Sequence, residues 1–302
     1  MILIADSGST KTDWCVVDGG NIICRVSTQG INPFHQDEQT ISSIIENELL
    51  PVITDLSLPP DTDSRAQNGE NTANVFPAIE HVCFYGSGCR EECVPMMTRV
   101  LSRSFPRAKK IEAHSDLLGA ARAVCGVGEG VACILGTGAN SCLYDGRRIV
   151  MNTPPLGYIL GDEGSGAVLG RLFINALYKG GLPAAVQSDF ERETGLTMPD
   201  VIRRVYREPL ANRFLASFAP FIHRHLSCPA VRAIVVDNFR QFFRRNVVQY
   251  GRPDLPVGAV GSIACHFSAE LSEAARAEGL TMGRIMKSPM EGLVEYHSHD
   301  NG

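Results

Sequence analysis

Short apolar runs separated by small polar residues organise the start of the chain. Residues 2–5 (ILIA) and 14–17 (WCVV) are apolar runs of strand length, and residues 7–12 between them are Ser, Gly, Thr and Lys. This pattern predicts two buried strands joined by a hairpin loop, with the second strand ending in the turn at 18–20.

The same pattern of apolar and polar positions predicts further helices and strands up to residue 125. Helices are expected at about 37–54, 90–104 and 116–125, and strands at about 79–85 and 110–114. Residues 57–74 are polar and contain Pro, which predicts a surface loop.

The opening pattern recurs in the second part of the chain. Val131–Leu135 is an apolar strand, residues 136–141 (GTGANS) form a loop of small residues, and residues 142–144 resume an apolar strand. The spacing is too large for a solenoid repeat. We therefore expect two α/β domains, residues 1–115 and 116–302, with the last helix able to pack back on the first domain.

Both hairpin loops have the composition of an anion site. Backbone N–H groups in loops of Gly, Ser and Thr approach an anion closely, and Lys11 adds a positive charge suited to phosphate. Asp6, at the end of the first strand, is placed to hold a hydrated Mg²⁺ ion. A plain polar turn explains either loop alone, and neither fits the P-loop pattern. Two such loops favour a polyphosphate held by both.

Two more Gly-rich segments follow. Residues 154–170 place several glycines around Asp162 and Glu163, just before an expected helix whose first N–H groups would face an anion or a sugar. Residues 257–271 show a strand, a Gly-Ser pair and an amphipathic helix. Tight backbone packing is the alternative explanation of each segment.

Bulk composition narrows the function classes. The 302 residues are 44% hydrophobic and 20% charged, with a net charge of −5, as in ordinary globular proteins. The absence of a basic stripe argues against nucleic acid. No apolar run approaches the ~20 residues that span a membrane, and residues 2–5 are a predicted strand rather than part of a signal peptide.

Cysteine and histidine usage adds an expectation about metals. The ten cysteines lie mostly in apolar settings, and Cys89 and Cys93 have no second pair that would complete a zinc or iron–sulfur site. Reduced structural thiols and a cytoplasmic location are expected. The group His297-Ser298-His299 is expected to belong to a frayed tail rather than to a metal site.

Four segments, in this order, resemble the sugar kinase/actin/heat-shock chaperone superfamily. They are DSGSTKTDW (6–14), LGTGANS (135–141), GYILGDEGSGAVLG (157–170) and AVGSIA (259–264). Within that superfamily the chain is similar to the N-acetylglucosamine kinase family, which is grouped with ATPases that activate benzoyl-CoA reductase and 2-hydroxyacyl-CoA dehydratase. The resemblance implies two ribonuclease-H-like domains with an ATP-binding cleft between them, the actin-like ATPase fold, and a homodimer.

The resemblance also implies roles for individual residues. The implied nucleotide-binding residues are Gly8, Ser9, Thr10, Lys11, Thr12, Gly136, Thr137, Gly138, Gly261 and Ser262. The implied sugar-binding residues are Asn32, Gly86, Ser87, Gly88, Asn140 and Asp162. Asp6 would face Mg²⁺ through water, and Asp116 would be the general base. From position alone, Asp116 is a cap of the helix at 116–125, and Glu163 competes with Asp162 for its role.

The implied activity is ATP-dependent phosphorylation of an amino sugar, N-acetylglucosamine to its 6-phosphate, with ATP and Mg²⁺. The alternative is an ATPase that activates a CoA-thioester reductase or dehydratase and holds an iron–sulfur cluster at a dimer interface. Residues 155–185 contain no Cys, and Cys228 and Cys265 are isolated, which favours the kinase. A catalytically inactive sugar-binding regulator is a third possibility.

Overall fold

The computed structural model describes residues 1–8, 10–55 and 79–299. Ser9 and the predicted loop at 57–74 lie outside the described residues. The chain divides into two compact units. One runs from Met1 to Ala123 and includes the segment from Pro289 onward, and the other is Val124–Ser288.

The boundary between the units differs from the expected one at 115/116. It falls within the last turn of α4 (Asp116–Cys125), whose Gly119 packs so closely on β4 that an added Cβ would lie 2.9 Å from the Cβ of Tyr85. The C-terminal helix α14 (Met290–His299) also belongs to the first unit, where Glu291 pairs with Arg25 at 2.9 Å.

The first unit is built on a mixed five-stranded sheet with the order β3-β2-β1-β4-β5. The strands are β1 (Ile2–Ser7), β2 (Lys11–Asp18), β3 (Asn21–Gln29), β4 (His81–Gly86) and β5 (Lys110–Ser115). The first three form an antiparallel meander, and β4 and β5 run parallel to β1. The predicted hairpin therefore joins β1 to β2.

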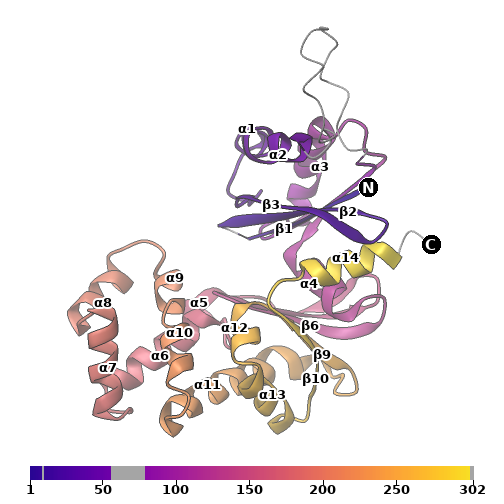
Figure 1. Ribbon diagram of the computed structural model, residues 1–302. Helices are drawn as coiled ribbons and strands as arrows, with labels where there is room; N and C mark the ends of the chain where they lie inside the picture. Colours follow the sequence, from indigo (N-terminus) through magenta and orange to yellow (C-terminus); the bar gives the residue numbers. More distant parts are fainter. Residues whose placement is uncertain (9, 56–78, 300–302) are drawn as a thin grey trace. The chain divides into compact units, whose positions relative to one another are not determined.

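Helices cover both faces of this sheet (Figure 1). One face carries α1 (Glu38–Ile44), the π-helical turn η1 (Ile45–Leu49), α2 (Leu50–Asp55), the 3₁₀ turn η3 (Glu91–Cys93) and α3 (Val94–Ser104). The other face carries α4 and α14. The predicted helix at 37–54 is thus three consecutive segments.

Strand alternation separates the two faces of the first sheet. Val82 and Phe84 point toward α1 and α3 and join a fully buried apolar core with Leu3, Trp14 and Leu101. Because side chains alternate along a strand, the intervening residues of β4 face α4 and α14.

The second unit repeats this topology. Its sheet has the order β10-β9-β6-β7-β8, made of β6 (Glu129–Leu135), β7 (Ala139–Asp145), β8 (Ile149–Asn152), β9 (Pro256–Val260) and β10 (Thr281–Met286). Here β6, β7 and β8 form the antiparallel meander, and β9 and β10 run parallel. Each strand thus has a counterpart in the first sheet, which confirms the predicted α/β fold with two similarly built units.

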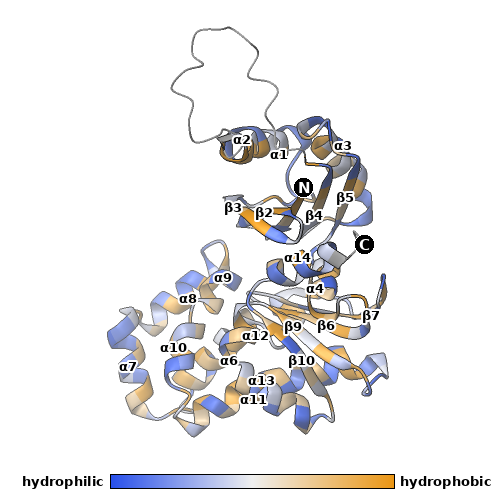
Figure 2. Ribbon diagram, turned by 45° about the vertical axis from the view of Figure 1, so that its right-hand side comes forward, coloured by the Kyte–Doolittle hydropathy of each residue, from blue (hydrophilic) through white to orange (hydrophobic). Residues whose placement is uncertain are grey.

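The remaining described helices all belong to the second unit (Figure 1). They are α5 (Gly157–Leu160), α6 (Gly166–Tyr178), α7 (Ala184–Thr194), α8 (Met198–Tyr206), α9 (Ala211–Ala216), α10 (Ala219–Arg224), α11 (Pro229–Phe242), the turns η4 (Phe243–Val247) and η5 (Val248–Tyr250), α12 (Ser262–His266) and α13 (Ser268–Ala277). A buried aromatic cluster links α6, α7 and α10, with the rings of Phe173, Phe190 and Phe221 5.4–5.8 Å apart. Figure 2 shows that apolar residues are concentrated in the strands of both sheets.

Candidate functional site

The carboxyl ends of three parallel strands bring most of the predicted residues of the first unit together. The register pairs Ser7 of β1 with Gly86 of β4, and Gly86 with Ser115 of β5. Asp6, the loop 86–88 and Asp116 therefore lie at one edge of the sheet. Ligands of α/β proteins bind at such carboxyl edges.

The first hairpin is held by a buried hydroxyl pair. Ser7 Oγ and Thr12 Oγ1 lie 2.6 Å apart, and each accepts from the N–H of Ile31 at 3.1 Å. Gly8 N donates to the carbonyl of Lys11 at 2.9 Å and closes the loop. Because Thr12 is fully buried and its hydroxyl is engaged, it fixes the shape of the hairpin from behind.

Gly30 supports the same hairpin, and the sequence did not single it out. A Cβ on Gly30 would lie 2.6 Å from Gly8 O and 2.7 Å from Thr10 N, both backbone atoms that cannot yield. Gly30 N also donates to Thr10 O at 3.1 Å. Only glycine permits this close approach.

Three carboxylates share the edge of the sheet. Burial, followed by the charges of Asp116 and Asp13, raises the pKa of Asp6 to about 7, and Lys11 partly opposes this. Burial also raises the pKa of Asp116 above its usual range. The Lys11 ammonium lies 2.8 Å from Asp13 Oδ2. The excess of negative charge is an environment that a cation would stabilise.

Asp116 also begins α4, as expected of a cap residue. Its Oδ1 accepts from Leu117 N at 2.9 Å, and Ser115 Oγ accepts from Leu118 N at 3.3 Å. The hydrogen bond from Leu117 N engages Oδ1 alone. The capping position and a role as a base are therefore compatible.

The predicted sugar residues of the first unit lie beside the hairpin. Ser87 N donates to Ser7 O at 2.8 Å. Asn32 Oδ1 lies where a Cβ on Gly88 would be, and it accepts from Phe34 N at 3.1 Å. The structure thus brings Asn32 against the loop 86–88.

The second hairpin is anchored to the start of α6. Gly136 N donates to Gly138 O at 3.0 Å, while Gly166 N and Ala167 N donate to the carbonyls of Gly136 and Thr137 at 2.8 and 3.2 Å. The expectation that the first N–H groups of this helix face a ligand is therefore wrong, because the hairpin carbonyls occupy them.

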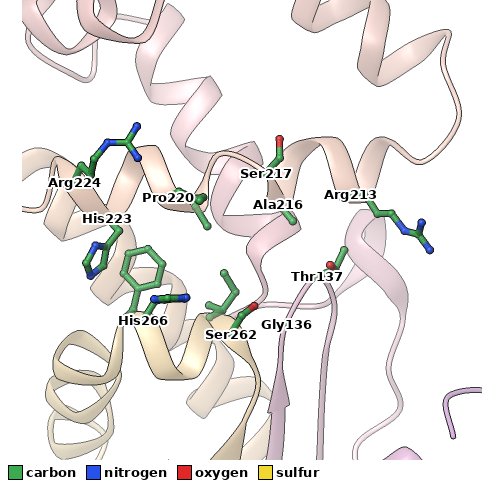
Figure 3. A pocket seen from close by; sticks show the side chains of 13 residues that line it. Gly136, Thr137, Arg213, Ala216, Ser217, Pro220, His223, Arg224, Ser262 and His266 are labelled. Atoms are coloured by element: carbon green, nitrogen blue, oxygen red, sulfur yellow. The ribbon is translucent and has the colours of Figure 1, made fainter. Parts of the chain in front are cut away.

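A cavity of about 510 Å³ lies next to this hairpin (Figure 3). Gly136, Thr137 and Ser262 line one side, together with Ile263, His266 and Phe267. The other side is formed by α9, α10 and their connection, through Arg213, Ala216, Ser217, Ala219, Pro220, His223 and Arg224. The sequence missed these residues of α9 and α10, because no motif or spacing links them to the hairpin.

Gly261 joins the cavity to the hairpin. Its φ is +129°, and a Cβ there would overlap the carbonyl oxygen of Leu135, the residue before Gly136. Glycine is therefore required at this strand-to-helix junction. The two motifs that the sequence predicted separately line a single cavity.

The side chains of Asp162 and Glu163 contact different parts of the second unit. Asp162 lies beside the hairpin, with Oδ2 3.1 Å from a Cβ built on Gly138, and its carboxylate accepts from backbone N–H groups of Gly157 and Ala139. Glu163 pairs with Arg245 at 3.3 Å. Asn140 Oδ1, on β7, accepts from Asn152 Nδ2 at 2.9 Å.

Comparison with solved structures gives the relatives of this architecture. Over the full length of both chains, it matches a provisionally assigned N-acetylglucosamine kinase of Porphyromonas gingivalis, with 49% sequence identity and a TM-score of 0.89. The chain belongs to the N-acetylglucosamine kinase family. This family membership confirms the resemblance inferred from the four segments, and the chain is an ATP-dependent sugar kinase.

A more distant member shows the fold alone. A provisionally assigned N-acetylglucosamine kinase of Chromobacterium violaceum matches 98% of both chains, with 16% identity and a TM-score of 0.67. No protein-family model and no curated protein matches the sequence. In the present protein, every helix among the described residues is too short or too polar to cross a membrane.

Proposed function

We propose that the protein transfers the γ-phosphoryl group of ATP to the 6-hydroxyl of N-acetylglucosamine, with Asp116 as the general base. The observation that carries the proposal is the register of β1, β4 and β5, which places Asp6 and Asp116 at one sheet edge beside the first hairpin. The family resemblance implies that Asp116, at this edge, removes the proton of the sugar hydroxyl.

Asp116 suits the role of a base chemically. A sugar hydroxyl is a weak nucleophile, and a carboxylate within hydrogen-bond reach accepts its proton as the bond to phosphorus forms, which is typically worth ~10²–10⁴-fold in rate. Burial raises the pKa of Asp116, which makes it a stronger base than an exposed aspartate. Because one oxygen caps α4, the carboxylate is held in a fixed orientation.

Mg²⁺ fits the acidic environment of Asp6. Asp6 takes a pKa of about 7 because burial and the charges of Asp116 and Asp13 disfavour its ionised form, and a divalent cation would reverse that effect. We propose that Asp6 holds the ion through its hydration water. A bound Mg²⁺ would neutralise phosphate charge during transfer.

The nucleotide residues divide into two groups. We propose that Gly8, Ser9, Thr10 and Lys11 of the first hairpin and Gly136, Thr137 and Gly138 of the second contact phosphates. We propose that Ser262, which lines the 510 Å³ cavity, and the adjoining Gly261 border the adenosine. Thr12 would act indirectly, because its hydroxyl is spent on Ser7 and Ile31.

The sugar would contact the loop 86–88 and Asn32, which lie together in the first unit. Asn140 and Asp162 lie beside the second hairpin, so a direct role in sugar binding rests on the family resemblance. We propose that Asp162 also positions that hairpin. A homodimer and a cytoplasmic location complete the proposal.

A coupled ADP-release assay against a panel of free sugars tests this function. The panel contains N-acetylglucosamine, N-acetylmannosamine, N-acetylmuramic acid, glucosamine and glucose, with Mg²⁺ and ATP. The highest kcat/KM is expected for N-acetylglucosamine, with phosphorus bound to O6 in the product by NMR. ATP hydrolysis without transfer to any sugar would overturn the proposal and favour the reductase or dehydratase activator. Sugar binding without turnover would indicate a regulator.

A further inference from the structure

The sheet face beneath α14 carries an unusual set of polar side chains. His81, Cys83 and Tyr85 alternate along β4 and share one face, opposite the apolar face of Val82 and Phe84. The register sets Cys83 beside Glu112 of β5. Buried polar groups are costly unless they find partners, so this layer needs an explanation.

Four ligand-type side chains meet in this layer. Cys83 Sγ lies 2.8 Å from His81 Nε2, 3.6 Å from Glu112 Oε2 and 3.8 Å from His297 Nδ1. His81 Nε2 lies 2.7 Å from Glu112 Oε2. Cys83 is fully buried and His297 is 2% exposed. The expectation of a frayed tail at 297–299 is therefore wrong for His297, since α14 carries it into the layer.

A second group of residues orients His297. Its Nε2 lies 2.8 Å from the Tyr85 hydroxyl, which also accepts from Arg122 Nη1 at 2.6 Å. With the Arg122 hydrogen bond in place, the Tyr85 oxygen can still accept from Nε2–H, which leaves the Nδ1 lone pair directed toward Cys83. Metal-binding histidines are commonly fixed in this way through their other ring nitrogen.

A lysine also lies beside this layer. Lys110 Nζ lies 3.1 Å from Glu112 Oε2 and would compete with a metal ion for this carboxylate.

We propose that His81, Cys83, Glu112 and His297 form a structural Zn²⁺ site that fastens α14 to the sheet of the first unit. Two imidazoles, one thiolate and one carboxylate are a preferred donor set for zinc, and the two anionic ligands balance its charge. Zinc bonds of ~2.0–2.3 Å in a tetrahedron separate the donor atoms by about 3.3–3.7 Å. The four separations given above, 2.7–3.8 Å, span that range, and the ligand atoms of His81, Cys83 and His297 all lie within 4.8 Å of one another.

Zinc would replace protons that these atoms now share. Binding releases the proton of the Cys83 thiol to solvent, and a proton on His81 Nε2 moves to Nδ1 of the same ring so that Nε2 can bind the metal. All four positions are then filled by protein, which is the arrangement of a structural site rather than a catalytic one. The zinc would link β4, the strand that leads into the loop 86–88, to α14, the last helix of the chain.

Cobalt substitution tests the site directly. The full-length chain, stripped of metal with a chelator, is titrated with Co²⁺ and then with Zn²⁺. Wild type is expected to bind one Co²⁺ per chain, with a thiolate-to-cobalt charge-transfer band and the intense visible bands of tetrahedral cobalt, and Zn²⁺ should abolish both. Because neither ATP nor sugar is used, failure of this site leaves the proposed kinase activity untouched.

Variants separate the proposed ligands from other buried residues. Cys83→Ser should lose the charge-transfer band, and His297→Gln should weaken Co²⁺ binding at least tenfold, while Tyr85→Phe should weaken it about 10- to 100-fold through the lost orientation of His297. Cys15→Ser is the matched control, a fully buried cysteine on β2 of the same unit.

The outcomes decide the question even if one variant fails to fold. Circular dichroism checks folding, and His297→Gln, near the end of the last helix, serves if Cys83→Ser is unfolded. The proposal is overturned if wild type shows no thiolate band at saturating Co²⁺. It is equally overturned if folded Cys83→Ser keeps the band of wild type, or if Cys15→Ser loses it.

Discussion

The hydroxyl oxygens of Ser7 and Thr12 lie 2.6 Å apart and close the base of the first hairpin. Both also accept from Ile31 N, so the hairpin is tied to the chain that follows β3. The family resemblance assigns Thr12 to nucleotide binding. Its hydroxyl instead supports the loop that carries the other implied nucleotide-binding residues.

Replacing the Thr12 hydroxyl should weaken the hairpin. Thr12→Val keeps the shape of the side chain but leaves buried partners unsatisfied, which typically costs about 1–3 kcal/mol. We expect a lower Tm and an ATP affinity reduced several-fold. Thr12→Ser, which keeps the hydroxyl, is the control and should retain most of the affinity measured by calorimetry. Equal affinity in Thr12→Val and wild type would show that the pair does not shape the site.

Asp116→Asn should remove most of the turnover while nucleotide binding stays close to wild type. Asparagine keeps an oxygen for the cap on Leu117 but cannot accept a proton, so kcat should fall by about 10²–10⁴-fold. The measurements are ADP release with N-acetylglucosamine and ATP affinity by calorimetry.

The matched control for the base is another helix-cap aspartate. Asp200 of α8 accepts from Thr197 N at 3.1 Å and lies in the other unit. Asp200→Asn should change turnover by less than about twofold. If Asp116→Asn retains more than about a tenth of wild-type turnover, Asp116 is only a cap.

The raised pKa of Asp6 makes stability depend on pH in the absence of divalent cations. Its pKa is about 7 in the folded protein and near 3.8 when unfolded, so the folded state binds more protons between these values. The contribution of Asp6 to the free energy of unfolding is therefore largest below about pH 4. It decreases as pH rises toward 7, by at most about 4 kcal/mol.

Thermal unfolding of Asp6→Asn checks this dependence. The variant should have a higher Tm than wild type at pH 8, and the difference should shrink as the pH is lowered to 5. Mg²⁺ with ATP should raise the Tm of wild type at pH 8 and have a smaller effect on Asp6→Asn. A difference in Tm that does not change with pH would contradict the assigned environment of Asp6.

Filling the cavity of the second unit should block the nucleotide alone. Ser262 is exposed and lines the cavity, so Ser262→Trp should place a ring there and lower ATP affinity more than tenfold. Binding of N-acetylglucosamine, measured separately by calorimetry, should change little. Ser188→Trp, at an exposed position of α7, is the control. Unchanged ATP affinity in Ser262→Trp would remove the cavity from the nucleotide site.

The sequence alone determined the repeated fold and the main motifs. Apolar runs of strand length around residues 7–12 and 136–141 predicted two hairpins, and both form between the first two strands of similarly ordered sheets. These predictions succeeded because hairpins and strand–helix junctions are local: their turn residues and their periodicity lie within a few positions of one another.

Only the tertiary structure decided which distant residues meet. The Thr12 side chain is buried, Gly30 packs against Gly8, and α9 and α10 line a cavity that no spacing in the sequence predicts. His297 reached Cys83 across more than two hundred residues through the packing of α14 on the first sheet. Such contacts depend on which faces two elements bury against each other, and that choice is made by long-range packing rather than by the local pattern of either element.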